Sequence, residues 1–140
     1  NNRNKLLTSN IEKIMKNNLK NKIITFLGVT FKAGTDDMRE SPSLKIIPKL
    51  IKRGAFIKYF EPTGLKKEFN KLKNIKYWLS IKEACKYSDL LIIHTEWNEF
   101  KQLNFKKLVK KNNFKIYDMR NLYSPNLMKK NKINYFCVGR

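Results

Sequence analysis

The sequence predicts an α/β fold in which helices cover both faces of a mainly parallel sheet of about five or six strands. Three observations predict it. Short apolar runs rich in β-branched residues recur along the chain, segments with helical periodicity separate them, and Gly, Pro or Ser marks their boundaries. With 140 residues, of which 41% are hydrophobic, the chain has the size and apolar content of one domain.

Six runs are predicted to be strands. The first and the fourth are short and nearly continuously apolar, which is typical of strands buried on both faces. The third is expected at an edge of the sheet. The predicted ranges are 22–28, 56–60, 75–78, 89–95, 115–118 and 135–138.

Helices are predicted before and between these strands. Helical spacing of apolar residues predicts one over 9–19, with Ser9 or Asn10 as its N-cap. Ser80 followed by Glu83 matches the capping-box pattern at the start of another. The other helical segments are predicted at 65–72, 80–87, 105–111 and 125–130.

One more helix follows the first strand. Ser41 is expected as its N-cap and Pro42 in its first turn, and Gly54 is a good signal for its end. Pro48 lies inside the pattern and removes a backbone donor, so a kink is expected there.

The net charge of +20 favours anionic partners: nucleic acid, acidic membranes or phosphorylated metabolites. The lysines are spread through every segment, which indicates a compositional habit rather than a binding tail. A basic nucleic-acid-binding module is the second functional class, supported by the charge and by Trp78, Trp97 and Tyr123. Most aromatic residues fall in predicted strands and no recognition motif is visible, so neither nucleic acid nor a membrane is expected as a partner.

The apolar runs, the N-terminus and the cysteines indicate the compartment of the protein and the redox state of its thiols. The longest apolar block is 90–93, too short to span a bilayer, and residues 1–10 lack the apolar centre of a secretory signal. The chain starts without Met and in mid-pattern, which suggests a piece of a longer protein. Cys85 and Cys137 have no metal-type spacing, so we expect reduced core thiols in a cytoplasmic protein.

Right-handed crossovers place the carboxyl ends of parallel strands at one edge of the sheet, where ligands of open α/β sheets bind. The first loop at this edge, within GVTFKAGTDDMRESPS, brings Lys32 and Arg39, two cations suited to phosphate. Thr30 stands where a GxGxxG fingerprint has its second glycine, so the loop is not a self-sufficient dinucleotide cradle. A capped turn with a structural salt bridge is the equally supported alternative. Besides this first loop, at 29–40, two more loops are expected at the same edge of the sheet, at 94–100 and 118–124.

The other two loops carry fewer reactive groups. His94 is the only histidine, and a lone histidine at a strand end is more often structural than a base. Glu96 and Trp97 are expected to pack against a neighbouring domain or to cap the next helix. Arg120 is a candidate phosphate or sugar contact, with an ion pair to Asp118 or Glu96 as its alternative.

Four stretches resemble the C-terminal UDP-binding domain of the UDP-glucose/GDP-mannose dehydrogenase family, most closely its branch that acts on UDP-glucose. They read LGVTFKAGTDDMRESPS, LIKRGAFIKYFEP, SDLLIIHTEWNEF and YDMRNLY, and they follow the family's order. The resemblance implies a Rossmann-like domain over 21–140, preceded at 1–20 by the end of a connecting helix from a central region.

The resemblance also implies a function. Family members use NAD to oxidise the C6 alcohol of a nucleotide sugar, here UDP-glucose to UDP-glucuronate, a precursor of polysaccharides. An N-terminal domain binds most of the NAD, a cysteine is the nucleophile, and a central helical region forms a homodimer. The N-terminal domain and the cysteine segment have no match in this chain, which is therefore expected to bind the UDP-sugar together with the rest of the same polypeptide and to be inactive alone.

Site residues follow from the same resemblance. Lys32 and Arg120, with Phe31 beside Lys32, resemble the family's substrate contacts, and Arg39 resembles a residue that reaches NAD. Met119 stands where the family usually has glycine in DGRN. No catalytic residue and no metal ligand is expected here. The remaining alternatives are another nucleotide-sugar dehydrogenase of this family and a stand-alone nucleotide-sugar sensor.

Overall fold

A six-stranded sheet forms the middle layer of the computed structural model, which describes residues 2 to 139. All its strands pair in parallel, in the order β3-β2-β1-β4-β5-β6. The predicted α/β class and parallel sheet are confirmed. The strands are β1 (Ile23–Leu27), β2 (Phe56–Phe60), β3 (Ile75–Tyr77), β4 (Leu90–Ile93), β5 (Lys115–Asp118) and β6 (Asn134–Cys137).

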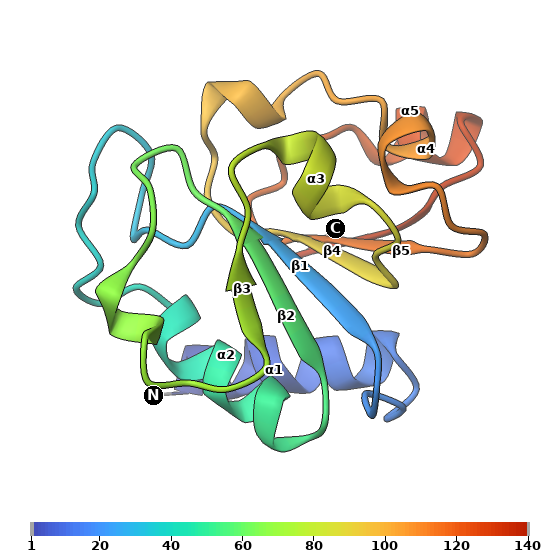
Figure 1. The fold of residues 1–140 in the computed structure, drawn as a ribbon. Coiled ribbons are helices and arrows are strands. Elements are labelled where there is room, and N and C mark those ends of the chain that lie inside the picture. Colours follow the sequence, from blue (N-terminus) through green and yellow to red (C-terminus); the bar gives the residue numbers. More distant parts are fainter. Residues whose placement is uncertain (1, 140) are drawn as a thin grey trace.

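Helices cover both faces of this sheet, as Figure 1 shows. On one face lie α1 (Asn2–Ile14) and α2 (Ser43–Lys52), and on the other lie α3 (Ile81–Cys85), α4 (Phe105–Val109) and α5 (Pro125–Lys130). Two 3₁₀ turns complete the described elements, η1 (Lys67–Phe69) and η2 (Asn98–Phe100).

Each face of the sheet has its own apolar core. Strand β4 shows the division, because successive side chains of a strand point to opposite faces. Leu90 and Ile92 pack in the core under α1 and α2, whereas Leu91 and Ile93 pack in the core under the other helices. All four are fully buried, which confirms the strand predicted from a continuous apolar run.

The first helix differs from its predicted range, 9–19. It spans Asn2–Ile14, so the predicted N-cap is wrong. Leu7 extends the buried stripe by one turn toward the N-terminus. Lys16 and Asn17 both have positive φ angles, 53° and 57°, which end the helix before residue 19.

The start of α2 also differs from the prediction. Pro42, not Ser41, holds the N-cap position, and no side chain caps the helix. The Ser41 hydroxyl donates instead to the buried main-chain oxygen of Val29, at 2.6 Å. The predicted end is confirmed, because Gly54 follows the helix with a φ of 97°.

The shorter elements follow the sequence in part. The helix predicted over 65–72 is reduced to the 3₁₀ turn Lys67–Phe69. The cap of α3 is confirmed, since the Ser80 side chain accepts the N–H of Glu83 at 3.1 Å. Pro48 lies inside α2, which continues to its predicted end.

The two cysteines differ in their surroundings. Cys85 is fully buried, and burial raises the pKa of its thiol to about 12, so the thiol stays protonated at neutral pH. The core prediction is thereby confirmed for Cys85 and wrong for Cys137, which is half-buried on the edge strand β6. Within residues 2 to 139, no helix has the length and apolar content needed to cross a membrane.

The strand ends that matter for function lie level with one another. The sheet order reverses between β1 and β4, so the loops after these strands leave toward opposite helical layers. The loop after β5 leaves from the same edge, beside β4. One row across the sheet holds Phe60, Leu27, Ile93, Asp118 and Cys137.

Candidate functional site

The three loops at the carboxyl edge are joined by the side chain of Arg120. Its Nε donates to the main-chain oxygen of His94 at 2.9 Å, and its Nη2 donates to the main-chain oxygen of Phe31 at 2.8 Å. The loops after β1, β4 and β5 are therefore in direct contact. The convergence predicted from the topology is confirmed for Arg120 and the residue that precedes Lys32.

Two cations at this meeting point have no carboxylate partner. Among residues 2 to 139, neither Lys32 nor Arg120 forms an ion pair, so the alternative of a pair with Asp118 or Glu96 is wrong. Lys32 is exposed and Arg120 is half-buried. Both cations lie in loops at the edge where the topology places ligands.

Asp118 has a different role, the folding of its own loop. One carboxylate oxygen accepts the main-chain N–H of Arg120 at 3.1 Å. The other accepts the N–H of Tyr123 at 2.9 Å and the hydroxyl of Tyr135 at 2.6 Å. Met119, between Asp118 and Arg120, is 5% exposed and packs in the core on the α1 and α2 face. The loop is thus anchored on both sides of the Arg120 side chain.

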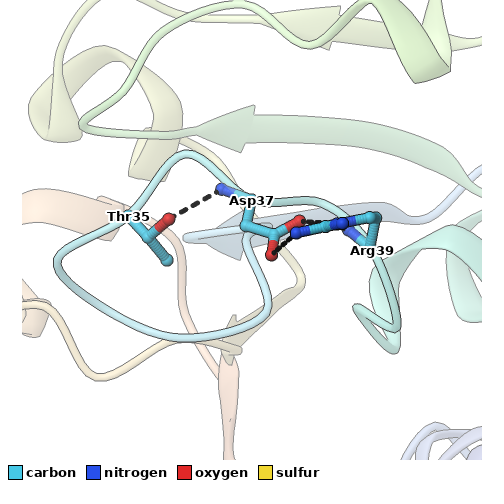
Figure 2. A network of polar contacts seen from close by, with 3 residues as sticks. All are labelled: Thr35, Asp37 and Arg39. Atoms are coloured by element: carbon cyan, nitrogen blue, oxygen red, sulfur yellow. Dashed lines mark hydrogen bonds and ion pairs between the residues drawn. The ribbon is translucent and has the colours of Figure 1, made fainter.

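Arg39 lies in a local polar network, drawn in Figure 2. Its Nε and Nη2 donate to the two carboxylate oxygens of Asp37 at 3.0 and 3.2 Å, and Thr35 accepts the main-chain N–H of Asp37. The bonds from Arg39 and the nearby charge of Lys32 lower the pKa of Asp37. The side chain of Arg39 is 89% exposed. The salt-bridge alternative therefore describes Arg39 and not Lys32.

Glu61 is a buried carboxylate that sequence reasoning missed. Its Oε1 accepts the main-chain N–H groups of Val29 and Thr30 at 2.8 and 3.3 Å. Its Oε2 accepts the N–H and hydroxyl of Thr63 at 3.0 and 2.7 Å. The residue is only 1% exposed. The available signal was an acidic residue directly after a predicted strand and before Pro62.

Glu61 follows β2 directly, at the position where dinucleotide-binding sheets carry an acidic residue. In dinucleotide-binding sheets, an acidic residue after the first βα unit hydrogen-bonds a ribose hydroxyl of the cofactor. Here that carboxylate points into the first loop and holds Val29 and Thr30, which replace the glycine-rich turn.

His94 is a buried, neutral side chain. It is 0% exposed, its Nδ1 bonds the Thr95 hydroxyl at 2.8 Å, and its Nε2 has no partner among the described residues. Burial lowers its pKa to about 3, with smaller contributions from the charges of Arg120 and Arg3. These features support the structural role predicted from the sequence.

This burial predicts a pH dependence of stability. The folded state binds a proton on His94 only near pH 3, whereas the unfolded chain binds one below about pH 6.5. The stability that comes from keeping His94 neutral is therefore fully present above the unfolded pKa and is lost as the pH falls below it. We expect the free energy of unfolding to drop by about 2 kcal/mol between pH 7.5 and pH 5.

Urea unfolding at these two pH values measures the effect. Because the chain has a single histidine, the His94→Leu variant is the control and should show almost no change over this interval. A wild-type chain that is equally stable at both values would contradict the burial of a neutral imidazole.

The candidate site includes exposed side chains at the rim of the sheet, since Phe31 is 42% and the Arg39 side chain 89% exposed. Five surface hollows of about 310 to 570 Å³ are all lined by segments other than the three loops. Over the described part of the chain, no three His, Cys, Asp or Glu side chains are grouped so as to hold a metal ion.

Sequence comparison identifies relatives over nearly the whole chain. The UDP-binding domain of the UDP-glucose/GDP-mannose dehydrogenase family matches residues 25–125. A UDP-glucose 6-dehydrogenase of Rickettsia prowazekii is 42% identical over 97% of this chain and 33% of its own length. One from Rhizobium meliloti is 35% identical over 84% of this chain and 27% of its own length. The chain spans about a third of the length of the Rickettsia relatives.

Solved structures share the fold. An NDP-N-acetyl-D-galactosaminuronic acid dehydrogenase from Methanosarcina mazei matches 99% of this chain and 29% of its own, with a TM-score of 0.79 and 20% identity. A UDP-glucose dehydrogenase from Pyrobaculum islandicum matches 95% of this chain and 28% of its own, with a TM-score of 0.74 and 21% identity. The similarities do not favour the nucleic-acid alternative. The chain belongs to the UDP-glucose/GDP-mannose dehydrogenase family and carries its UDP-binding domain.

Proposed function

We propose that this chain is the UDP-binding part of an NAD-dependent enzyme that oxidises UDP-glucose to UDP-glucuronate, and that Lys32 and Arg120 hold the diphosphate. The observation that carries this proposal is the bond from Arg120 to the main-chain oxygen of Phe31. It links the two loops and brings the Arg120 guanidinium to the residue next to Lys32. Support for the substrate comes from relatives about 40% identical that are UDP-glucose 6-dehydrogenases.

The two cations suit a diphosphate in different ways. Arg120 uses its Nε–H and one N–H of Nη2 on main-chain oxygens, so its remaining N–H groups are available to a phosphate in a fixed direction. The ammonium of Lys32 is exposed and makes no hydrogen bond or ion pair among the described residues, and its flexible stem lets it follow the diphosphate as it enters. Phe31, 42% exposed, offers an apolar face beside them to the nucleotide or the sugar.

The proposed division of the polypeptide assigns UDP binding to this chain and most of the NAD binding to another segment. We propose that residues 1–20 end a connecting helix, that 21–140 form the UDP-binding domain, and that a separate domain binds most of the NAD. Arg39 is proposed to reach NAD from the rim, where its high exposure makes its guanidinium accessible beside Asp37. The whole polypeptide is proposed to act in the cytoplasm as a homodimer.

Binding at this rim contributes to catalysis at a distance. Held by its diphosphate, the sugar has its C6 alcohol oriented against the cysteine and the nicotinamide supplied by the other segments. Binding energy from the unreactive part of the substrate thereby lowers the barrier at the reacting carbon.

Replacing Lys32 tests the proposal. In the full-length polypeptide, Lys32→Ala is expected to raise the KM for UDP-glucose about 5- to 150-fold, the range that follows from losing one charged hydrogen bond. Steady-state kinetics measures it. Because Lys32 is exposed, the fold should be retained.

The matched control is Lys52→Ala, an exposed lysine at the far end of α2, which should leave the KM unchanged. A KM for UDP-glucose unaffected by Lys32→Ala would contradict the proposed site. Turnover of a UDP-N-acetylhexosamine in place of UDP-glucose would correct the sugar and leave the UDP site in place.

A further inference from the structure

The turn that carries Lys32 is held through every main-chain N–H and C=O group of the three residues that precede it, 29–31. The bonds measure 2.6 to 3.3 Å and come from several separate segments. Val29 is bonded by Glu61 and by the hydroxyls of Ser41 and Ser43. Thr30 is bonded by Glu61 and Thr95. Phe31 is bonded by the main-chain oxygen of Asp37 and by Arg120.

One of these bonds belongs to a buried relay from β4. The Thr95 hydroxyl donates to the main-chain oxygen of Thr30 at 3.0 Å. A threonine hydroxyl has one proton, so the 2.8 Å contact between Thr95 and Nδ1 of His94 requires the histidine to donate. His94, Thr95 and Thr30 are each 0% exposed, so the relay is shielded from water.

Close packing keeps Thr95 in this position. A Cβ atom placed on Gly28 would lie 2.6 Å from the Cβ and 2.7 Å from the Oγ1 of Thr95, so only glycine leaves room for the hydroxyl here. The imidazole of His94 packs against Phe26, with ring centroids 5.9 Å apart. Gly28 thus leaves room for Thr95, and Phe26 packs against the ring that bonds its hydroxyl.

We propose that Thr95 is a positioning residue of the UDP-sugar site, acting through Thr30 to hold the turn that presents Lys32, and that His94 orients its hydroxyl. The inference rests on the proposed function of Lys32. A ligating side chain binds best when the segment that carries it is already ordered in the bound geometry. Without the bond from Thr95, part of the ligand's binding energy is spent on ordering the turn.

The expected signature is a loss of substrate affinity that depends on the hydroxyl. In the full-length enzyme, Thr95→Val should raise the KM for UDP-glucose and the inhibition constant of UDP about 3- to 10-fold, the range for one neutral hydrogen bond. The kcat and the KM for NAD should change less than about twofold, because the lost interaction is equally present in ground and transition states. Thr95→Ser keeps the hydroxyl and should restore both constants.

Two comparisons separate positioning from a general effect on folding. Thr25 is also fully buried and also donates to a main-chain oxygen, that of Ala84, but it lies in the middle of β1. Thr25→Val should lower stability without changing the inhibition constant of UDP. In a Lys32→Ala background, Thr95→Val should add little further loss, because the two residues act through one contact.

The outcomes are distinct. If Lys32→Ala weakens UDP binding and Thr95→Val does not, the positioning role is overturned while the proposed function stands. If the two effects multiply in the double variant, Thr95 does not act through Lys32 and the inference is also overturned. If Lys32→Ala has no effect, the proposed site itself is contradicted. Where the valine variant does not accumulate in folded form, Thr95→Ala replaces it with the same expectation.

Discussion

Replacing Glu61 with alanine is expected to lower the free energy of unfolding by about 3 to 5 kcal/mol, since it leaves buried donors without an acceptor. The carboxylate accepts four hydrogen bonds, two of them from the N–H groups of Val29 and Thr30, which are fully buried. Water cannot reach these two groups to replace the carboxylate. The cost therefore includes their desolvation as well as the lost bonds.

Urea unfolding of the variant at pH 7.5 measures this loss. Glu68→Ala, an exposed glutamate in the same loop after β2, is the control and should change stability by less than about 0.5 kcal/mol. Glu61→Gln should fall between the two, because its amide keeps one acceptor oxygen and turns a donor toward the other N–H groups. Equal stabilities for the variants at 61 and 68 would contradict the role given to Glu61.

The second large effect is expected for Gly28→Ala, about 2 to 4 kcal/mol of lost stability from overpacking and an unfavourable φ together. Its φ is 80°, a region that a residue with a side chain rarely adopts. The added methyl group would also meet Thr95 at 2.6 Å, far inside van der Waals contact. Gly28 donates its N–H to the main-chain oxygen of Phe60, and the Thr95 hydroxyl bonds His94 and Thr30. Moving either residue away from the added methyl group would break these bonds.

Gly34→Ala is a closely matched control for this variant. It lies in the same loop with almost the same φ, 81°, but a Cβ atom there would meet nothing within 4 Å. It should cost about 1 kcal/mol, the backbone penalty alone. The difference between the two variants in thermal or urea unfolding isolates the contact with Thr95. Equal losses would show that this contact is not tight.

The sheet could be predicted because its strands carry strong local signals. The run 90–93 is apolar on both faces, and Gly28 ends the first predicted strand while Pro62 closely follows the second. The helix ends were less predictable, because α1 begins well before its predicted cap and Leu7, near its start, packs into the core. Ser41 illustrates the same limit. Its hydroxyl satisfies a buried oxygen of β1's loop instead of capping the next helix, and only the tertiary structure decides between these bonds.

The candidate site, too, could be predicted only in part. The topology predicted that the loops of Lys32 and Arg120 meet, and the family resemblance singled out both residues. The groups that order these loops were missed, because their partners are distant in sequence: Glu61 is 32 residues from Val29, and Thr95 is 65 residues from Thr30. No local pattern specifies such bonds. A salt bridge within the first loop was foreseen as an alternative, and Arg39 and Asp37, only two residues apart, form one.

The affinity of the full-length enzyme for UDP and for uridine, measured by calorimetry with and without Lys32→Ala, tests the central claim most directly. If Lys32 faces the diphosphate, the variant should bind UDP at least about fivefold more weakly and should bind the uncharged nucleoside as the wild type does. Equal weakening for both ligands, or unchanged affinity for UDP, would contradict the placement of the diphosphate at this rim.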